Sequence, residues 1–309
     1  MPEKIVITGL GAVSGIGNNV KENWENAING VSGVGPITQF DTSDFLVKIG
    51  AEVKDFDPEQ YMEAREVRRR DRHQCFGAAA VAQALEHSGL EITEKNAPRI
   101  GSVISAAIGG LNAMEVGIVD VHEQGPRKAS PFMIPMMMPN GVAGLAGIDH
   151  GMKGPALSVA SACASGQDGI GTAWMMLRAG VLDAAVAGAA ESTITPVGVA
   201  AFDRMQAMSH RAADEGTPSP FDKNRDGLVI GEGAAILILE TESHAKARGA
   251  EILAELAGYG SSADAYHITA PHEKGLGGSQ AIRQALDVAG IADSDLGYIN
   301  AHEIGRAHV

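Results

Sequence analysis

Short apolar runs separated by helical stretches constrain the fold of this chain more than any other feature. The runs have the length of strands, are apolar on both faces and end at glycine or polar residues. They cover residues 4–10, 99–105, 155–161, 183–189, 234–240, 251–260 and 296–301. Helical patterns lie between several of them, as at 78–90 and 168–180. This alternation predicts an α/β fold with a largely parallel, internally buried sheet.

Length and composition favour a folded cytoplasmic protein. The 309 residues suffice for one large domain or two medium ones, and 45% of them are hydrophobic, which supports a sizeable core. No stretch approaches the ~20 apolar residues of a membrane span, and the first residues lack a signal-peptide pattern. The two cysteines, Cys75 and Cys163, lie far apart, which is typical of a reducing compartment.

The net charge of −14 makes nucleic acids and anionic membranes poor partners for the surface as a whole. Two basic segments, 65–73 and 125–130, interrupt this acidic chain. They include Arg65, Arg68, Arg69, Arg127 and Lys128. The residues alone leave two interpretations open: solvated helix surface, or a docking patch for an acidic partner.

Familiar cofactor motifs fail on their spacing. Gly9 and Gly11 begin a dinucleotide fingerprint, but Ser14 stands where it requires a third glycine. The segment 222–233 resembles a calcium loop, but Gly233 occupies the position of the bidentate glutamate. Because no HExxH or CxxC pattern exists either, we expect no metal and no cofactor.

Cys163 is the candidate nucleophile. It lies among the small residues 158–166, directly after an apolar run and before a helix expected over about 164–179. The free N–H groups and the dipole of a helix N-terminus favour a thiolate there, and they can hold an oxyanion. A small core residue is the alternative interpretation of Cys163. Cys75 lies in a helical apolar pattern, which indicates packing.

The segment ASACASGQDGIGTA, 160–173, resembles the nucleophile motif of the β-ketoacyl-acyl-carrier-protein synthases, in the thiolase superfamily. Further segments match in family order, closest to the synthase II branch that elongates bacterial fatty acids. They are 130–140, 191–209, 219–234, 264–277 and 298–302. The resemblance implies a five-layered αβαβα fold of two similar halves and a homodimer. We expect residues 1–250 to form the first half and 251–302 to begin an incomplete second half.

The resemblance also implies a decarboxylative Claisen condensation between an acyl thioester on Cys163 and malonyl-acyl carrier protein. His302 in YINAH matches the first of two catalytic histidines of the family. An apolar tunnel for the acyl chain would be lined or gated by residues that could equally be ordinary core: Ile108, Phe132, Met133 and Phe202. Because acyl carrier protein is acidic, the basic segments become its expected docking site.

The match to the family ends abruptly after His302. Residues 303–309 fit no family pattern, and the second catalytic histidine, a lysine and a glycine-rich loop are absent from the sequence. We therefore predict that 303–309 is a non-native tail and that this polypeptide by itself is inactive as a condensing enzyme.

Other functions remain alternatives at this point. A polyketide-type ketosynthase would keep the fold and change the pathway. A non-catalytic partner subunit of a condensing enzyme would lack the active cysteine, so Cys163 counts against it. A cysteine hydrolase would need a Cys–His–acid triad, and the sequence specifies no acid.

Overall fold

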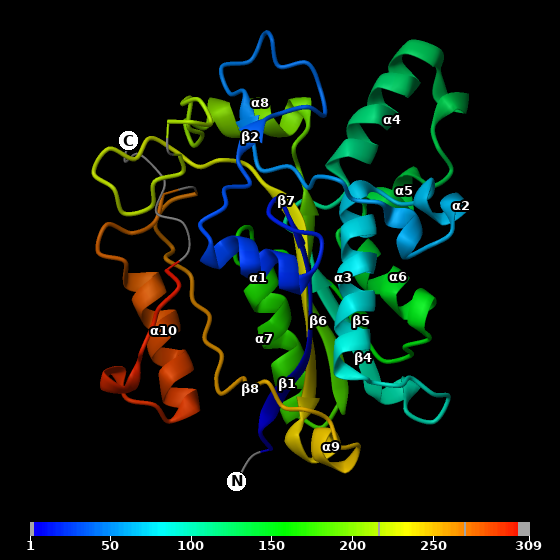
Figure 1. Ribbon diagram of the computed structural model, residues 1–309, viewed down its shortest axis with the longest axis vertical. Coiled ribbons are helices and arrows are strands. Elements are labelled where there is room, and N and C mark those ends of the chain that lie inside the picture. Colours follow the sequence, from blue (N-terminus) through cyan, green and yellow to red (C-terminus); the bar gives the residue numbers. More distant parts are fainter. Residues whose placement is uncertain (1–2, 216, 269, 302–309) are drawn as a thin grey trace.

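A computed structural model describes residues 3–215, 217–268 and 270–301 (Figure 1). The predicted catalytic residue His302 and the predicted tail 303–309 lie outside the described residues. The division of the chain near residue 250 stays a prediction.

One six-stranded sheet, in the order β5-β4-β6-β7-β1-β8, forms the centre of the molecule. Its strands are β1 (Ile5–Ser14), β4 (Ile100–Ser105), β5 (Ala156–Leu157), β6 (Ala184–Ser192), β7 (Glu232–Thr241) and β8 (Ala254–Glu255). Strand β4 pairs in parallel with β5 and β6, whereas β7 is antiparallel to both β6 and β1, and β8 is antiparallel to β1. The sheet is therefore mixed.

The prediction of a largely parallel sheet was wrong for a physical reason. Helices cover both faces of the central strands, so β1 and β7 are apolar on both faces although they run antiparallel to each other. An apolar run reports burial on two faces and carries no information about strand direction. The run at 296–301 was also misassigned, because those residues, all described, form no strand.

Helices α3 (Arg72–Ser88) and α6 (Gly141–His150) cover one face of the sheet, and α7 (Ser165–Arg178) covers the other (Figure 1). Asp71 starts α3 with a capping box that it shares with Gln74. A Cβ atom on Gly11 would lie 1.9 Å from the carbonyl oxygen of Ala80 in α3. The glycines that resemble a dinucleotide motif therefore serve close packing of β1 against α3.

Shorter elements surround this core. The helices are α1 (Val20–Ile28), α2 (Ala64–Val67), α4 (Leu111–Gln124), α5 (Met133–Met137), α8 (Pro196–Arg204), α9 (Glu242–Ala247) and α10 (Leu276–Ala289). A small second sheet pairs β2 (Gly35–Pro36) with β3 (Ile49–Gly50). Within the described ranges, no helix combines the length and the apolar character needed to cross a membrane.

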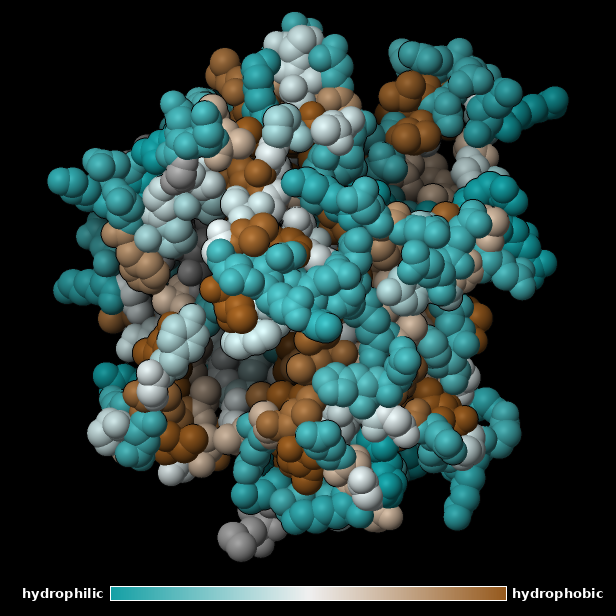
Figure 2. Space-filling view, in the orientation of Figure 1, coloured by the Kyte–Doolittle hydropathy of each residue, from teal (hydrophilic) through white to brown (hydrophobic). Residues whose placement is uncertain are grey.

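An apolar surface lies along α10 and the segment that follows it. In Figure 2, hydrophobic side chains gather over the lower end of this helix. The exposed members are Ile282, Val288, Ile291, Leu296, Tyr298 and Ile299. Contiguous apolar surface of this kind marks a place where further protein packs.

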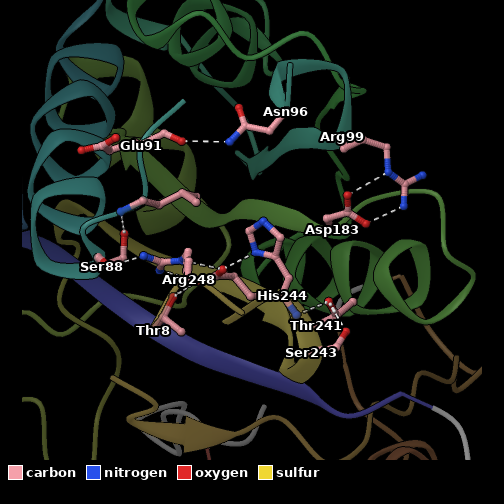
Figure 3. A network of polar contacts seen from close by, with 12 residues as sticks. Thr8, Ser88, Glu91, Asn96, Arg99, Asp183, Thr241, Ser243, His244 and Arg248 are labelled. Carbon is pink, nitrogen blue, oxygen red and sulfur yellow. Dashed lines mark hydrogen bonds and ion pairs between the residues drawn. The ribbon is translucent and has the colours of Figure 1, made fainter. Parts of the chain in front are cut away.

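A buried carboxylate joins α9 to the sheet (Figure 3). Glu240, near the end of β7, is fully buried. One of its oxygens accepts from Thr8 Oγ1 at 2.5 Å and Arg248 Nη2 at 2.6 Å. The other oxygen is 2.5 Å from His244 Nδ1 and 2.9 Å from Arg248 Nε. Arg248 also donates to the carbonyl of Ser88, so the network ties β1, α3, β7 and α9 together.

We expect acid to remove the stability that Glu240 supplies. Burial opposes its ionisation, but the hydrogen bonds from Arg248, Thr8 and His244 outweigh burial and hold the pKa of Glu240 below its ordinary value of 4.5. The contribution should be fully present above that value and be lost as pH falls through the lower folded-state pKa. The urea midpoints of wild type and Glu240→Gln should therefore stay apart above pH 4.5 and converge over the acidic range below it. A difference that stays constant over this range would contradict the assignment.

Candidate active site

Cys163 lies in a sharp turn between β5 and α7. It is exposed and unpaired, and it lies two residues before the first helical residue, Ser165. Ala162 has a φ of +52°, in the left-handed region that residues with a side chain rarely adopt. The structure thus confirms that a thiol is displayed at the N-terminus of α7, and it places this thiol on a strained backbone.

Side chains on both sides of the cysteine hold this turn. Ser165 Oγ donates to the carbonyl of Ala162 at 2.6 Å and accepts from the N–H of Ser161 at 2.9 Å. The backbone adds hydrogen bonds from Ala164 N to Ser161 O and from Ser165 N to Ala162 O. The position of the thiol is therefore fixed by short bonds within the turn.

Asp168 gives the turn a second support. Its carboxylate accepts from Ser161 Oγ at 2.5 Å and from the hydroxyl of Tyr259 at 2.6 Å. Burial is the largest cause that raises the pKa of Tyr259, and the hydrogen bond to Asp168 is the second. The segment after β8 is thus hydrogen-bonded, through Asp168, to the turn that carries Cys163. Neither Asp168 nor Tyr259 was among the site residues predicted from the sequence, although an acid in the first turn of a helix is a recognisable stabilising signal.

The other cysteine has the opposite surroundings. Cys75 is buried within α3, and burial raises the pKa of its thiol to about 11. A thiol that is protonated at neutral pH and closed to solvent is a poor nucleophile. The contrast favours Cys163 as the reactive cysteine.

The turn lies at the carboxyl ends of the parallel strands. Ser105, the last residue of β4, accepts from the N–H of Val159 at 3.2 Å. A Cβ atom on Gly169 of α7 would lie 2.4 Å from Ser105 Oγ, so the helix passes directly over the end of the strand. In α/β sheets, ligands bind at this edge.

The proposed tunnel residues lie in different surroundings. Ile108 follows β4 and is 40% exposed. Met133 begins α5 and contacts α4 at Gly117. Phe132 is half-buried beneath the guanidinium of Arg69, 4.9 Å from its ring centre. Phe202 in α8 packs against a buried cluster that includes Val199 and Met208, which fits ordinary core packing equally well.

The candidate docking residues are all exposed. Arg65, Arg68 and Arg69 lie in or beside α2, and Arg127 and Lys128 lie in a short 3-10 turn, Pro126–Lys128, that follows α4. Arg65 and Arg69 form ion pairs with Glu66, which reduces the net positive charge of the first segment. The contact between Arg69 and Phe132 brings the α2 segment beside the start of α5.

Comparison with known proteins defines the class. The model of the β-ketoacyl synthase N-terminal domain matches residues 2–245, and that of the C-terminal domain matches residues 253–308. The chain therefore belongs to the β-ketoacyl synthase family, as its motifs predicted.

The relatives named 3-oxoacyl-[acyl-carrier-protein] synthase 2 specify the branch. The one from Vibrio cholerae is 45% identical and one from Staphylococcus aureus is 43% identical, each over 97% of this chain and 72% of the relative.

Solved structures confirm the thiolase-like fold. A β-ketoacyl synthase from Burkholderia phymatum aligns with a TM-score of 0.89 and 31% identity, over 99% of this chain and 75% of that one. The ishigamide ketosynthase/chain length factor aligns with a TM-score of 0.89 and 32% identity, over 99% and 74%.

Proposed function

We propose that this protein is a 3-oxoacyl-[acyl-carrier-protein] synthase of the type II branch, a condensing acyltransferase of fatty-acid elongation. The observation that carries the proposal is the exposed Cys163 on its braced turn at the N-terminus of α7. The identity of 45% to a synthase 2 supports the choice of branch.

The geometry of the turn suits each bond change at the sulfur. The Cys163 thiolate attacks the carbonyl carbon of an acyl-carrier thioester; a new S–C bond forms and the carrier thiol leaves with a proton. Malonyl carrier protein then loses carbon dioxide, and the electron pair of the broken bond forms an enolate. The enolate carbon attacks the acyl-enzyme, a C–C bond forms and the Cys163 thiolate leaves. We propose that His302 donates a hydrogen bond to the enolate oxygen.

A turnover assay with the complete product of the gene tests this function. Carrier protein loaded with an acyl chain and carrier protein loaded with malonate should together yield one 3-ketoacyl product, two carbons longer than the acyl chain, and one carbon dioxide per turnover. Rapid release of free fatty acid without malonyl carrier protein would instead indicate a cysteine hydrolase.

A polyketide-type ketosynthase is the second candidate. The specific observation is a similarity to a chain of a solved complex, described as a type II PKS acyl-carrier protein in complex with its ketosynthase bound to the hexaketide. The two chains are 30% identical and align with a TM-score of 0.88, over 99% of this chain and 75% of that one. Product length distinguishes the two. Several successive malonyl additions on one chain, without reduction between them, would favour the polyketide activity.

We expect charge reversal at Arg127 and Lys128 to weaken binding of acyl carrier protein. The variant Arg127→Glu/Lys128→Glu should raise KM for the carrier about tenfold at low salt, because it removes attraction to an acidic partner. The effect should shrink at high salt, and kcat should stay near its wild-type value. Lys246→Glu, on α9 at the other end of the sheet, is the control for a charge reversal outside the candidate docking site (Figure 1). Equal effects of both variants would exclude a docking role for the first site.

We also propose a homodimer in the cytoplasm. The outer edge of β5 is the end of the sheet, and Leu157 on it is 42% exposed. An exposed strand edge with an apolar side chain is a template for pairing with a second copy. Sedimentation at equilibrium should give twice the chain mass, and a variant with proline at Leu157 should shift the mass toward the monomer.

A further inference from the structure

Glu191 makes an unusual contact with the turn between β4 and α4. One oxygen of its carboxylate accepts from the backbone N–H of Ala107 at 2.7 Å and of Ile108 at 3.0 Å. The other oxygen accepts from the N–H of Gly109 at 3.1 Å. Successive backbone N–H groups that converge on one anion form a nest, and here the anion belongs to the chain itself. Bonds of this charge-assisted kind are the strong ones.

The sheet register explains how Glu191 reaches the turn. In the parallel pair of β4 with β6, Ser105 lies opposite Ala189. Glu191 is two residues beyond Ala189, so its side chain leaves the sheet on the same face and at the end where the turn begins. The carboxylate thus closes the gap that β4 leaves when it stops at Ser105.

The opposite side of the turn is equally confined. Gly109 has a φ of +86°, and a Cβ atom on Gly110 would lie 2.1 Å from the carbonyl oxygen of Met136. The N–H of Gly110 also donates to the carbonyl of Met137 at 3.4 Å. The turn is therefore held between Glu191 and the methionine-rich segment of α5, and removal of either contact frees one side of it.

This turn starts at the edge of the sheet where Cys163 is displayed. Ser105, which precedes it, contacts the chain on both sides of the cysteine, at Val159 and at Gly169. Ile108 remains 40% exposed because the turn holds it out of the core. An exposed apolar side chain thus lies in the turn that leaves the sheet at the edge where Cys163 is displayed, and the turn is held by three hydrogen bonds to one carboxylate.

We propose that Glu191 is a positioning residue that fixes Ile108 beside the acyl site and thereby sets which acyl chains load onto Cys163. This inference rests on the proposed condensing function. None of the hydrogen bonds described for Glu191 reaches the turn that carries Cys163, so we propose that it acts through the turn 107–109.

The test compares acyl loading by wild type, Glu191→Ala and Glu191→Asp in the complete gene product. Transfer from acyl carrier protein to the enzyme is measured for chains from four to sixteen carbons. Glu191→Ala should change the ratio of long-chain to short-chain loading about tenfold, and Glu191→Asp should restore most of it. Alkylation of Cys163 by iodoacetamide should stay within about twofold of wild type, because the thiol turn is intact.

A double-mutant cycle shows whether Glu191 acts through Ile108. In an Ile108→Ala background, Glu191→Ala should leave the loading ratio unchanged.

Glu115→Gln is the matched control, because Glu115 caps α8 through Thr195 Oγ1 and Val197 N, and its described hydrogen bonds do not reach the 107–109 turn. Hydrogen exchange at the amides of 107–109 should speed up at least about tenfold in Glu191→Ala and not in the control.

Two failures are distinguishable. The positioning role would be overturned if Glu191→Ala had the wild-type loading profile. It would also be overturned if the effects of Glu191→Ala and Ile108→Ala on the loading ratio simply multiplied. The condensing function would stand in both cases. If the wild-type protein loads no acyl chain on Cys163, the proposed function fails, and the role of Glu191 in acyl selection fails with it.

Discussion

Cys163→Ser should lower the rate of carbon–carbon bond formation at least about a thousandfold. A serine hydroxyl is far less ionised than a thiol at neutral pH. The side-chain hydrogen bonds described for Ser161, Ser165 and Asp168 join these residues to each other, to Ala162 and to Tyr259, and none of them would activate a hydroxyl at position 163. Acyl transfer to the enzyme should disappear along with condensation. The measurement is the single-turnover rate of 3-ketoacyl product formation.

Cys75→Ala is the control for this substitution. Its thiol is buried, with a pKa of about 11, and takes no part in the reaction we propose. The variant should keep its turnover within about threefold of wild type and lose only the modest stability expected of a small buried truncation. A Cys163→Ser protein that condenses at the wild-type rate would refute the assignment of the nucleophile.

Glu240→Gln should lower the free energy of unfolding by about 3 kcal/mol or more. The substitution removes the buried anion that Arg248 and His244 face, and so leaves the charge of Arg248 and the hydrogen bonds from both side chains without their anionic partner. The effect acts on stability and not on chemistry, because the network lies at the end of the sheet where α9 begins (Figure 3). Urea unfolding at neutral pH measures it.

Asp183→Asn provides the comparison. Asp183 forms a bidentate pair with Arg99, but both side chains are about two-fifths exposed, and such pairs contribute roughly 0–1 kcal/mol. Burial is the difference between the two carboxylates. Equal losses from Glu240→Gln and Asp183→Asn would show that the Glu240 network does not have the importance we assign to it.

The sequence predicted those features that depend on interactions between residues close together along the chain. The small residues before Cys163 and the helical period after it predicted the displayed thiol, and α7 begins within one residue of the expected position. The apolar runs located β1, β4, β6 and β7 to within a few residues. These features depend on neighbours along the chain, so one segment suffices to recognise them.

Contacts between distant segments could not be predicted in this way. Tyr259 supports the thiol turn from 91 positions away in sequence through Asp168, and Glu191 holds a turn 82 to 84 positions away. Neither residue belongs to a local pattern that names its partner. The antiparallel direction of β7 escaped prediction for the same reason, because only the path of the connecting chain determines it.

The most direct test locates the acyl group during turnover. The complete protein is incubated with acyl carrier substrate alone, quenched in acid, digested and analysed by mass spectrometry. We predict one acyl group per chain, carried as a thioester on the peptide that contains Cys163. When malonyl carrier protein is added before the quench, this group should be converted to a product two carbons longer. Product formation with Cys163 unmodified throughout, or an acyl group on a different residue, would contradict it.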